Sequence, residues 1–359
     1  MKTVIPVLYM VTALLLALTI AGCDSSGGGN GQEDLSTITY AGTFYEGQGD
    51  TIDSSSPMTS SYFYPEVKVT SPAVRAFEAD AFFVLKGSVN NTGAFQYSIV
   101  YVEKKSTGEQ TSYWVRGNYQ KRIWLRFGAG EYTVTVHRTE ITSGNCDDYS
   151  GDILGWQYWT ATYTFTVYNT RVEDGTFSYP SDPVQSDSMD ILEIAQDITA
   201  GDTAEYDKIL SVHDYVVTSL FYDDDSLVPG ERKKQDALTT LENGTGVCEG
   251  YTSLYNALLR SLGIPSKCIA GWAGTSPPDP PESINHAWSQ VYGDSVWKYV
   301  DTTWDDPGPH DAEPYNLFYT FFWQDSLTDH YHVDEIDRPE RSILPQENRK
   351  WVGYPDGIY

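Results

Sequence analysis

A cysteine, Cys248, lies where a helix is predicted to begin, in the stretch GVCEGYTSLYNALLRSLGIP (246–265). Apolar residues recur there at three- and four-residue steps, the period of one buried helical face, and Gly263 followed by Ile264 and Pro265 indicates a helix end. Unpaired backbone N–H groups and the positive end of the helix dipole at such a start favour the thiolate over the thiol. This position predicts a nucleophile, and a small apolar core residue is the alternative interpretation of Cys248.

Two strand-like segments follow, HAWSQVY from His286 and SVWKYVD ending at Asp301, separated by Gly293 and Asp294. Glycine at the first central position predicts a two-residue type II′ turn. Counting outward from that turn pairs His286 directly with Asp301 on one face, with Cβ atoms about 5 Å apart. A three-residue loop would instead send Asp301 to the opposite face. With Cys248, the imidazole and the carboxylate predict a Cys–His–Asp triad: a nucleophile, its base, and the acid that orients the base.

The motifs GVCEGY, GIPSKCIAGW, NHAWSQVY and WKYVDTTWDD occur in this order and resemble the core of the transglutaminase-like superfamily, over about residues 205 to 335. The resemblance implies a papain-like α+β domain with an antiparallel sheet. It also implies that Cys248 is the nucleophile, His286 the general base and acid, and Asp301 the orienting acid. The backbone N–H of Cys248 would lie in the oxyanion hole, where the second donor, a Trp or a Gln in different branches of the family, stays unassigned.

The reaction expected of this triad is attack on a carboxamide or peptide carbonyl, formation of a thioester acyl-enzyme, and transfer to water or to an amine. The enzyme would be a thiol hydrolase, either a peptidase or an amidase, or a protein-glutamine acyltransferase. Hydrolysis is slightly favoured because water is the default acceptor unless a site excludes it. The substrate would be a protein or a cell-wall peptide, and the chemistry requires no metal or organic cofactor. The alternative is a non-catalytic binding or scaffold lipoprotein that retains the fold.

The first 22 residues have the features of a secretory signal peptide: a basic start at Lys2 and an apolar run over 7–20 that is too short for an ordinary spanning helix. The run ends in Ile-Ala-Gly-Cys, which resembles the lipobox of bacterial lipoproteins and implies a lipid on Cys23. An ordinary signal cleaved nearby is the alternative. Residues 23–36, rich in Gly and Ser, would form a flexible tether. These features predict a membrane-anchored extracytoplasmic lipoprotein, on the periplasmic face or at the cell surface.

The charge of the chain limits its partners. The formal net charge is −27, and residues 1–22 hold one lysine and no acid, so a chain beginning at Cys23 would carry −28. This excess of acid argues against a nucleic-acid partner. It also disfavours docking on anionic lipid, so attachment to a membrane would depend on the lipid anchor.

At 359 residues the chain is long enough for two domains. Residues 37–170 alternate in the manner of antiparallel strands, which predicts an all-β sandwich with an immunoglobulin-like form as one option. Residues 171–187, with Gly and Pro, read as a linker. In residues 188–359 the spacing of apolar residues changes to the period of helices, and helices are expected at 189–198 and 204–220. The strands expected in the first domain are 62–69, 81–89, 95–102, 112–116, 122–127, 132–137 and 160–168.

Three other residues could bear chemistry but receive ordinary roles. His213 adjoins the apolar stripe of the predicted helix 204–220, so we expect a packed core histidine. Cys268 is expected in the core of a strand. It is not expected to form a disulfide with Cys146, because the two fall in separate predicted domains.

Overall fold

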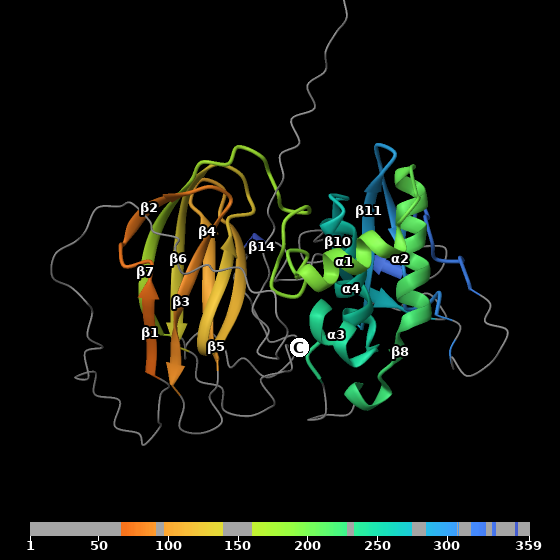
Figure 1. The fold of residues 1–359 in the computed structure, drawn as a ribbon, viewed down its shortest axis with the longest axis horizontal. Coiled ribbons are helices and arrows are strands. Elements are labelled where there is room, and N and C mark those ends of the chain that lie inside the picture. Colours follow the sequence, from red (N-terminus) through yellow and green to blue (C-terminus); the bar gives the residue numbers. More distant parts are fainter. Residues whose placement is uncertain are drawn as a thin grey trace, which may run out of the picture.

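The computed structural model describes residues 66–90, 97–138, 160–227, 233–274, 285–306, 308, 317–327, 332–334 and 349–350 (Figure 1). The predicted signal peptide, the lipidation residue Cys23, the tether and Cys146 lie outside the described residues. Within the described ranges, no helix has both the length and the apolar character needed to cross a membrane.

The N-terminal half forms a curled β-sheet, and its strands follow the order β1-β3-β5-β4-β6-β7-β2. Neighbours along this path are antiparallel except β7 and β2, which are parallel. The short strand β14 (Arg349–Lys350) pairs with β5. The other strands are β1 (Glu66–Ser71), β2 (Ala76–Ala79), β3 (Phe82–Asn90), β4 (Tyr97–Lys104), β5 (Glu109–Trp124), β6 (Gly130–Arg138) and β7 (Thr160–Asn169).

Strand β5 differs from the sequence prediction: the expected strand 112–116 and residues 122–124 of the expected strand 122–127 belong to one 16-residue strand. Its first half pairs with β4 and its second half with β3. Between the halves lies Gly117, whose φ of 53° is a left-handed conformation that glycine adopts without strain. The long bent strand therefore joins two groups of strands into one curled sheet. The immunoglobulin-like form and the division into two domains remain predictions.

The C-terminal half combines helices with a second sheet. Helix α1 (Met189–Ile198) has the predicted bounds, and α2 (Glu205–Ser219) lies within the predicted 204–220. The sheet has the order β12-β11-β10-β13 and is antiparallel throughout, as predicted. Its strands and the remaining elements are β8 (Phe221–Tyr222), the 3₁₀ turn Asp224–Leu227, α3 (Ala237–Asn243), β9 (Thr245–Gly246), α4 (Cys248–Ser261), β10 (Ser266–Ala273), β11 (His286–Gly293), β12 (Val296–Val300) and β13 (His332–Asp334).

Helix α4 is the centre of this half. The sequence pattern predicted one buried face, but every residue from Gly250 to Arg260 is buried. Helices α1, α2 and α3 and strands β10 and β11 all pack against it. The helix ends at Ser261, and the predicted stop residue Gly263, whose φ is 80°, follows its C-terminal cap. Its large side chains, among them Tyr251, Tyr255 and Leu258, make up much of the core and fix the position of its first residue, Cys248.

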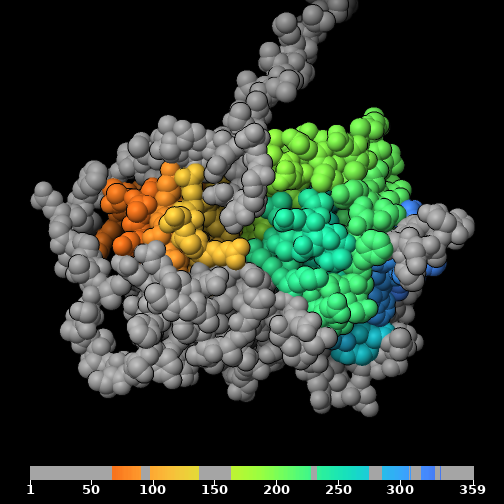
Figure 2. Space-filling model, turned by 60° about the horizontal axis from the view of Figure 1, so that its bottom comes forward, coloured from red at the N-terminus to blue at the C-terminus, as the bar shows by residue number. Residues whose placement is uncertain are grey.

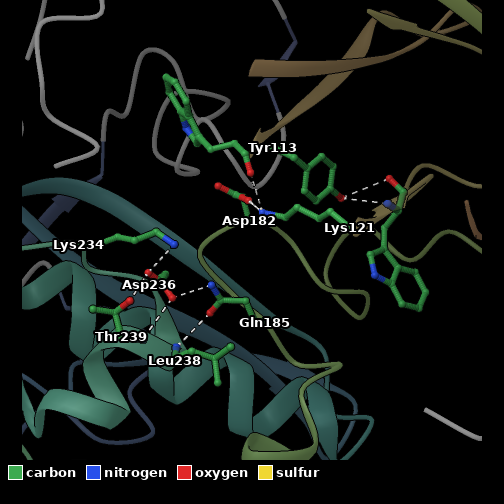
Figure 3. A network of polar contacts seen from close by, with 10 residues as sticks. Tyr113, Lys121, Asp182, Gln185, Lys234, Asp236, Leu238 and Thr239 are labelled. Carbon is green, nitrogen blue, oxygen red and sulfur yellow. Dashed lines mark hydrogen bonds and ion pairs between the residues drawn. The ribbon is translucent and has the colours of Figure 1, made fainter. Parts of the chain in front are cut away.

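The curled sheet and the helices lie side by side (Figures 1 and 2). The segment between them contacts both. From β5, Lys121 forms an ion pair with Asp182, and the indole N–H of Trp124 donates to Asp187 at 3.1 Å. On the other side, the Gln185 amide donates to Asp236 at 2.6 Å at the start of α3 (Figure 3). These contacts hold the predicted linker 171–187 between the two halves.

Candidate active site

Cys248 is the first residue of α4, and its thiol is free and partly exposed. The preceding residue, Val247, is extended, and its N–H donates to the side-chain oxygen of Gln235 at 2.8 Å. No side chain caps the helix N-terminus. The positive end of the helix dipole therefore lies beside the thiol, as the sequence predicted.

Glycines on both sides of Cys248 allow the helix start to pack closely on its support. A Cβ atom at Gly250 would lie 2.6 Å from the side-chain oxygen of Gln235 and 2.7 Å from the hydroxyl of Thr240. At Gly246 it would lie 3.1 Å from a methyl group of Thr240. Gln235 is buried, so these glycines leave room for the amide that binds the chain at Val247.

The hairpin that carries the next two residues has a different turn from the one predicted. Tyr292 pairs with Trp297 and Gly293 with Val296, so the turn residues are Asp294 and Ser295. Their φ values of 50° and 67° are those of a type I′ turn. Gly293 is needed for packing instead, since a Cβ there would lie 2.6 Å from Ile209 and 2.7 Å from Trp323.

The predicted register is therefore wrong by two residues, but the predicted face is right. Asp301 lies diagonally from His286 rather than directly opposite it. Because side chains alternate with a period of two, a shift by an even number leaves both residues on the same face. Nε2 of His286 and Oδ2 of Asp301 are 2.7 Å apart, a hydrogen bond between two buried side chains.

Asp301 is fully buried and accepts several hydrogen bonds. Its Oδ1 accepts the backbone N–H groups of Thr303 and Trp304 at 2.9 and 3.1 Å. Burial alone would raise the pKa of this carboxyl, but the charge of His286 and the hydrogen bonds from His286 and His332 hold that pKa well below its usual range. Asp301 is therefore a carboxylate at neutral pH.

The same contact shifts the pKa of the His286 imidazole in the opposite direction. Burial favours neutral His286, yet the negative charge of Asp301 and the hydrogen bond to it outweigh burial and raise the pKa of the ring. A hydrogen bond with Cys248 adds to this rise in pKa. Since Nε2 is engaged by Asp301, Nδ1 is the nitrogen that remains for Cys248. The three predicted residues thus meet in one place: Cys248 bonds to the imidazole of His286, which bonds to Asp301.

Sequence reasoning missed a fourth residue at the site, His332 of β13. Its Nε2 lies 2.8 Å from Oδ2 of Asp301, the same oxygen that His286 contacts. Strand β13 has three residues and lies far along the chain from the hairpin, so no periodic pattern could reveal it. The available signal was a histidine in the segment DHYHVD, which follows the motif that contains Asp301.

His286, Asp301 and His332 offer three potential metal-ligand atoms within 4.8 Å of one another. The two nitrogens, however, are 2.7 and 2.8 Å from the carboxylate oxygen. Ligands on one tetrahedral zinc ion stand about 3.3 Å apart, given metal–nitrogen and metal–oxygen distances near 2 Å. Hydrogen bonding therefore accounts for this cluster without a metal.

Two other expectations are confirmed. Cys268 is fully buried in the core of the C-terminal half, and His213 is fully buried on α2. The imidazole of His213 bonds to Asp214 at 3.0 Å and to Asp305 at 3.1 Å. These two carboxylates raise its pKa although burial opposes the charge. His213 thus joins α2 to the turn after Asp301.

A helix-start thiol with a buried histidine and carboxylate is the kind of site that cysteine-dependent enzymes use. Residues 192–302 match the family model of the transglutaminase-like superfamily, so the chain contains a transglutaminase-like domain that includes Cys248, His286 and Asp301. A comparison with the curated proteins gives no match.

Two solved structures are similar over part of the chain. A proposed cysteine protease from Cytophaga hutchinsonii is 18% identical over 62% of this chain and 78% of its own, with a TM-score of 0.31. A proposed protease from Parabacteroides distasonis is 15% identical over 59% of this chain and 44% of its own, with a TM-score of 0.27. Both scores are too low to support a conclusion about activity, so the family assignment rests on residues 192–302.

Proposed function

We propose that this protein is a cysteine enzyme that forms a thioester with the acyl group of a peptide or carboxamide substrate. The observation that carries the proposal is the 2.7 Å bond between His286 and Asp301, with Cys248 at the start of α4 in hydrogen-bonding contact with the same imidazole. An acid that orients a base, and a base that meets a thiol, are the requirements of nucleophilic catalysis.

In the first step the Cys248 thiolate attacks the substrate carbonyl carbon and a C–S bond forms. The oxyanion accepts a hydrogen bond from the Cys248 backbone N–H, which the helix start leaves available. His286 gives its proton to the departing amine as the C–N bond breaks, and a thioester remains. In the second step His286 takes a proton from water or an amine, which attacks the thioester and returns the sulfur as thiolate.

Hydrolysis and acyl transfer share this triad, so the acceptor depends on the access of water. We favour hydrolysis of a protein or cell-wall peptide. The protein is further proposed to be a lipoprotein, anchored outside the cytoplasm through Cys23. The curled sheet would then be a separate spacer or binding domain between the anchor and the catalytic domain.

The test is the rate of alkylation of Cys248 in the full-length chain, purified in detergent and measured from pH 4 to 10 (about the range in which thiol and imidazole titrate). Cys248 should react faster than a free thiol below neutral pH, and His286→Ala should abolish the difference. Cys248→Ala identifies the labelled residue, and Cys268→Ala is the matched control with a buried thiol. If Cys248 reacts like a free thiol and His286→Ala changes nothing, the protein is a binding or scaffold protein. A peptide library with and without an added amine then separates hydrolase from transferase.

A further inference from the structure

One carboxylate oxygen at the proposed active site has two histidine partners. Oδ2 of Asp301 lies 2.7 Å from Nε2 of His286 and 2.8 Å from Nε2 of His332. The other oxygen of Asp301 is occupied by two backbone N–H groups. Because an ionised carboxylate can only accept, both ring nitrogens must donate to it. Asp301 is therefore shared between the proposed base, His286, and a second histidine.

The side chain of the second histidine is buried and contacts its neighbours on several sides. His332 is 2% exposed, and its backbone N–H donates to the carbonyl of Leu327 at 3.1 Å. Its ring contacts the rings of Trp304 and Trp288, with centroids 4.5 and 5.1 Å away. Strand β13 pairs it with Ala273 at the edge of the sheet. A polar ring is costly to bury, and this one points its donor at the carboxylate rather than at solvent.

We propose that His332 is a positioning residue, which fixes the Asp301 carboxylate by sharing its Oδ2 and so sets both the orientation and the acidity of His286. This inference rests on the proposed function. Two donors on one acceptor oxygen weaken each other, so His332 limits the hold of Asp301 on the His286 proton. A base held less tightly gives up that proton more readily to the leaving group.

The titratable groups that face His286 come from three elements. Cys248 lies at the start of α4, Asp301 follows β12, and His332 lies on β13. Asp305, in the turn after Asp301, adds a further negative charge near that carboxyl. Of these, His332 is the residue that can be changed to remove one donor while Cys248, Asp301 and Asp305 stay in place.

The test compares His332→Gln with His332→Met in the full-length chain. The two side chains have nearly the same length, but only glutamine keeps an N–H donor. The pKa of His286 is followed by NMR of labelled histidine, and Cys248 alkylation is followed in parallel. In His332→Met we expect the pKa of His286 to rise by about 0.5 pH unit and alkylation to slow on the order of tenfold through lost alignment. His332→Gln should restore both toward wild type.

Equal pKa values of His286 in wild type and His332→Met would overturn the inference, as would a His332→Gln variant that behaves like His332→Met. If His332→Met does not fold, wild type is compared with His332→Gln instead. A low-field signal from the ring N–H of His332 should be present in wild type and missing in His332→Gln. Absence of that signal from wild type would refute the shared oxygen. The NMR result does not depend on activity. A wild type with an unreactive Cys248 therefore refutes the proposed function separately.

Discussion

Replacing Asp301 by asparagine changes one carboxylate oxygen into an amide nitrogen with little change in volume. The side chain is fully buried and accepts four hydrogen bonds, two from backbone N–H groups and two from imidazoles. The amide oxygen can keep the two backbone bonds. The amide nitrogen cannot accept from either histidine, so two donors in a buried site lose their acceptor.

The expected loss follows from those two bonds. Hydrogen bonds to a charged group contribute about 1.5 to 3 kcal/mol each, and breaking a buried ion pair from one side costs about 3 to 5 kcal/mol. We therefore expect Asp301→Asn to lower the free energy of unfolding by about 3 to 5 kcal/mol. The reactivity of Cys248 should fall by roughly 10³- to 10⁴-fold, because His286 loses the group that selects its tautomer.

The stability difference should depend on pH on both sides of neutrality. The pKa of Asp301 is lowered in the folded state, so its contribution is present above the unfolded value near 3.9 and is lost as the pH falls. The pKa of His286 is raised, so its contribution is complete below about 6.5 and is lost as the pH rises through the raised value. The difference between wild type and Asp301→Asn should thus be greatest at about pH 4 to 6.5.

Urea unfolding of both proteins across this pH range measures the difference directly. Asp325→Asn is the matched control, because Asp325 pairs with Lys298 but is 88% exposed, so little change is expected. A stability difference that stays constant from pH 3 to 9 would refute the ion pair. Equal losses in both variants would show that burial of Asp301 contributes nothing.

Three further changes test the support of the site. His213→Leu removes a partner from buried Asp305 and should lower the free energy of unfolding in urea by about 3 to 5 kcal/mol. An unchanged urea midpoint would contradict the contact between His213 and Asp305. Gly250→Ala places a methyl group 2.6 Å from Gln235, so it should lower the free energy of unfolding by about 1 to 3 kcal/mol and slow alkylation of Cys248. Unchanged stability and alkylation would show that the start of α4 can shift to make room for the methyl group. Cys268→Ala should lower stability by about 1 kcal/mol through a small cavity, with alkylation kinetics unchanged.

Local patterns predicted helices α1, α2 and α4, but the short helix α3 (Ala237–Asn243) was not predicted. The bounds of α1 and the helical segment of α4 follow from the spacing of apolar residues, and the end of α4 follows from Gly263. The contact between His286 and Asp301 also follows from a local pattern, since a hairpin keeps the two residues on one face when its register is shifted by an even number. The β5 strand was divided in two because Gly117 interrupts its pattern, although the chain continues pairing through it.

Contacts between elements far apart in the chain could not be predicted from the sequence. Gly293 was assigned to the turn, yet its role is to let Ile209 and Trp323 approach, which depends on the packing of α2 against the hairpin. His332 was missed because its partner is reached through the pairing of β13 with β10. The all-round burial of α4 was missed because a polar residue such as Asn256 can find partners inside the core: its amide N–H groups donate to Ser289 at 2.7 Å and to the carbonyl of Thr252 at 2.8 Å.

The burial of α4 has a consequence for the entropy of the reaction. A helix enclosed by three helices and two strands cannot slide or rotate unless many core side chains move with it. In the proposed enzyme, the conformational freedom lost in aligning Cys248 with His286 would therefore be lost once, when the chain folds, and not again with each substrate. Substrate binding would then have to order only the substrate, so a change to a core residue of α4 that shifts the helix start should slow alkylation of Cys248 as well as lower stability.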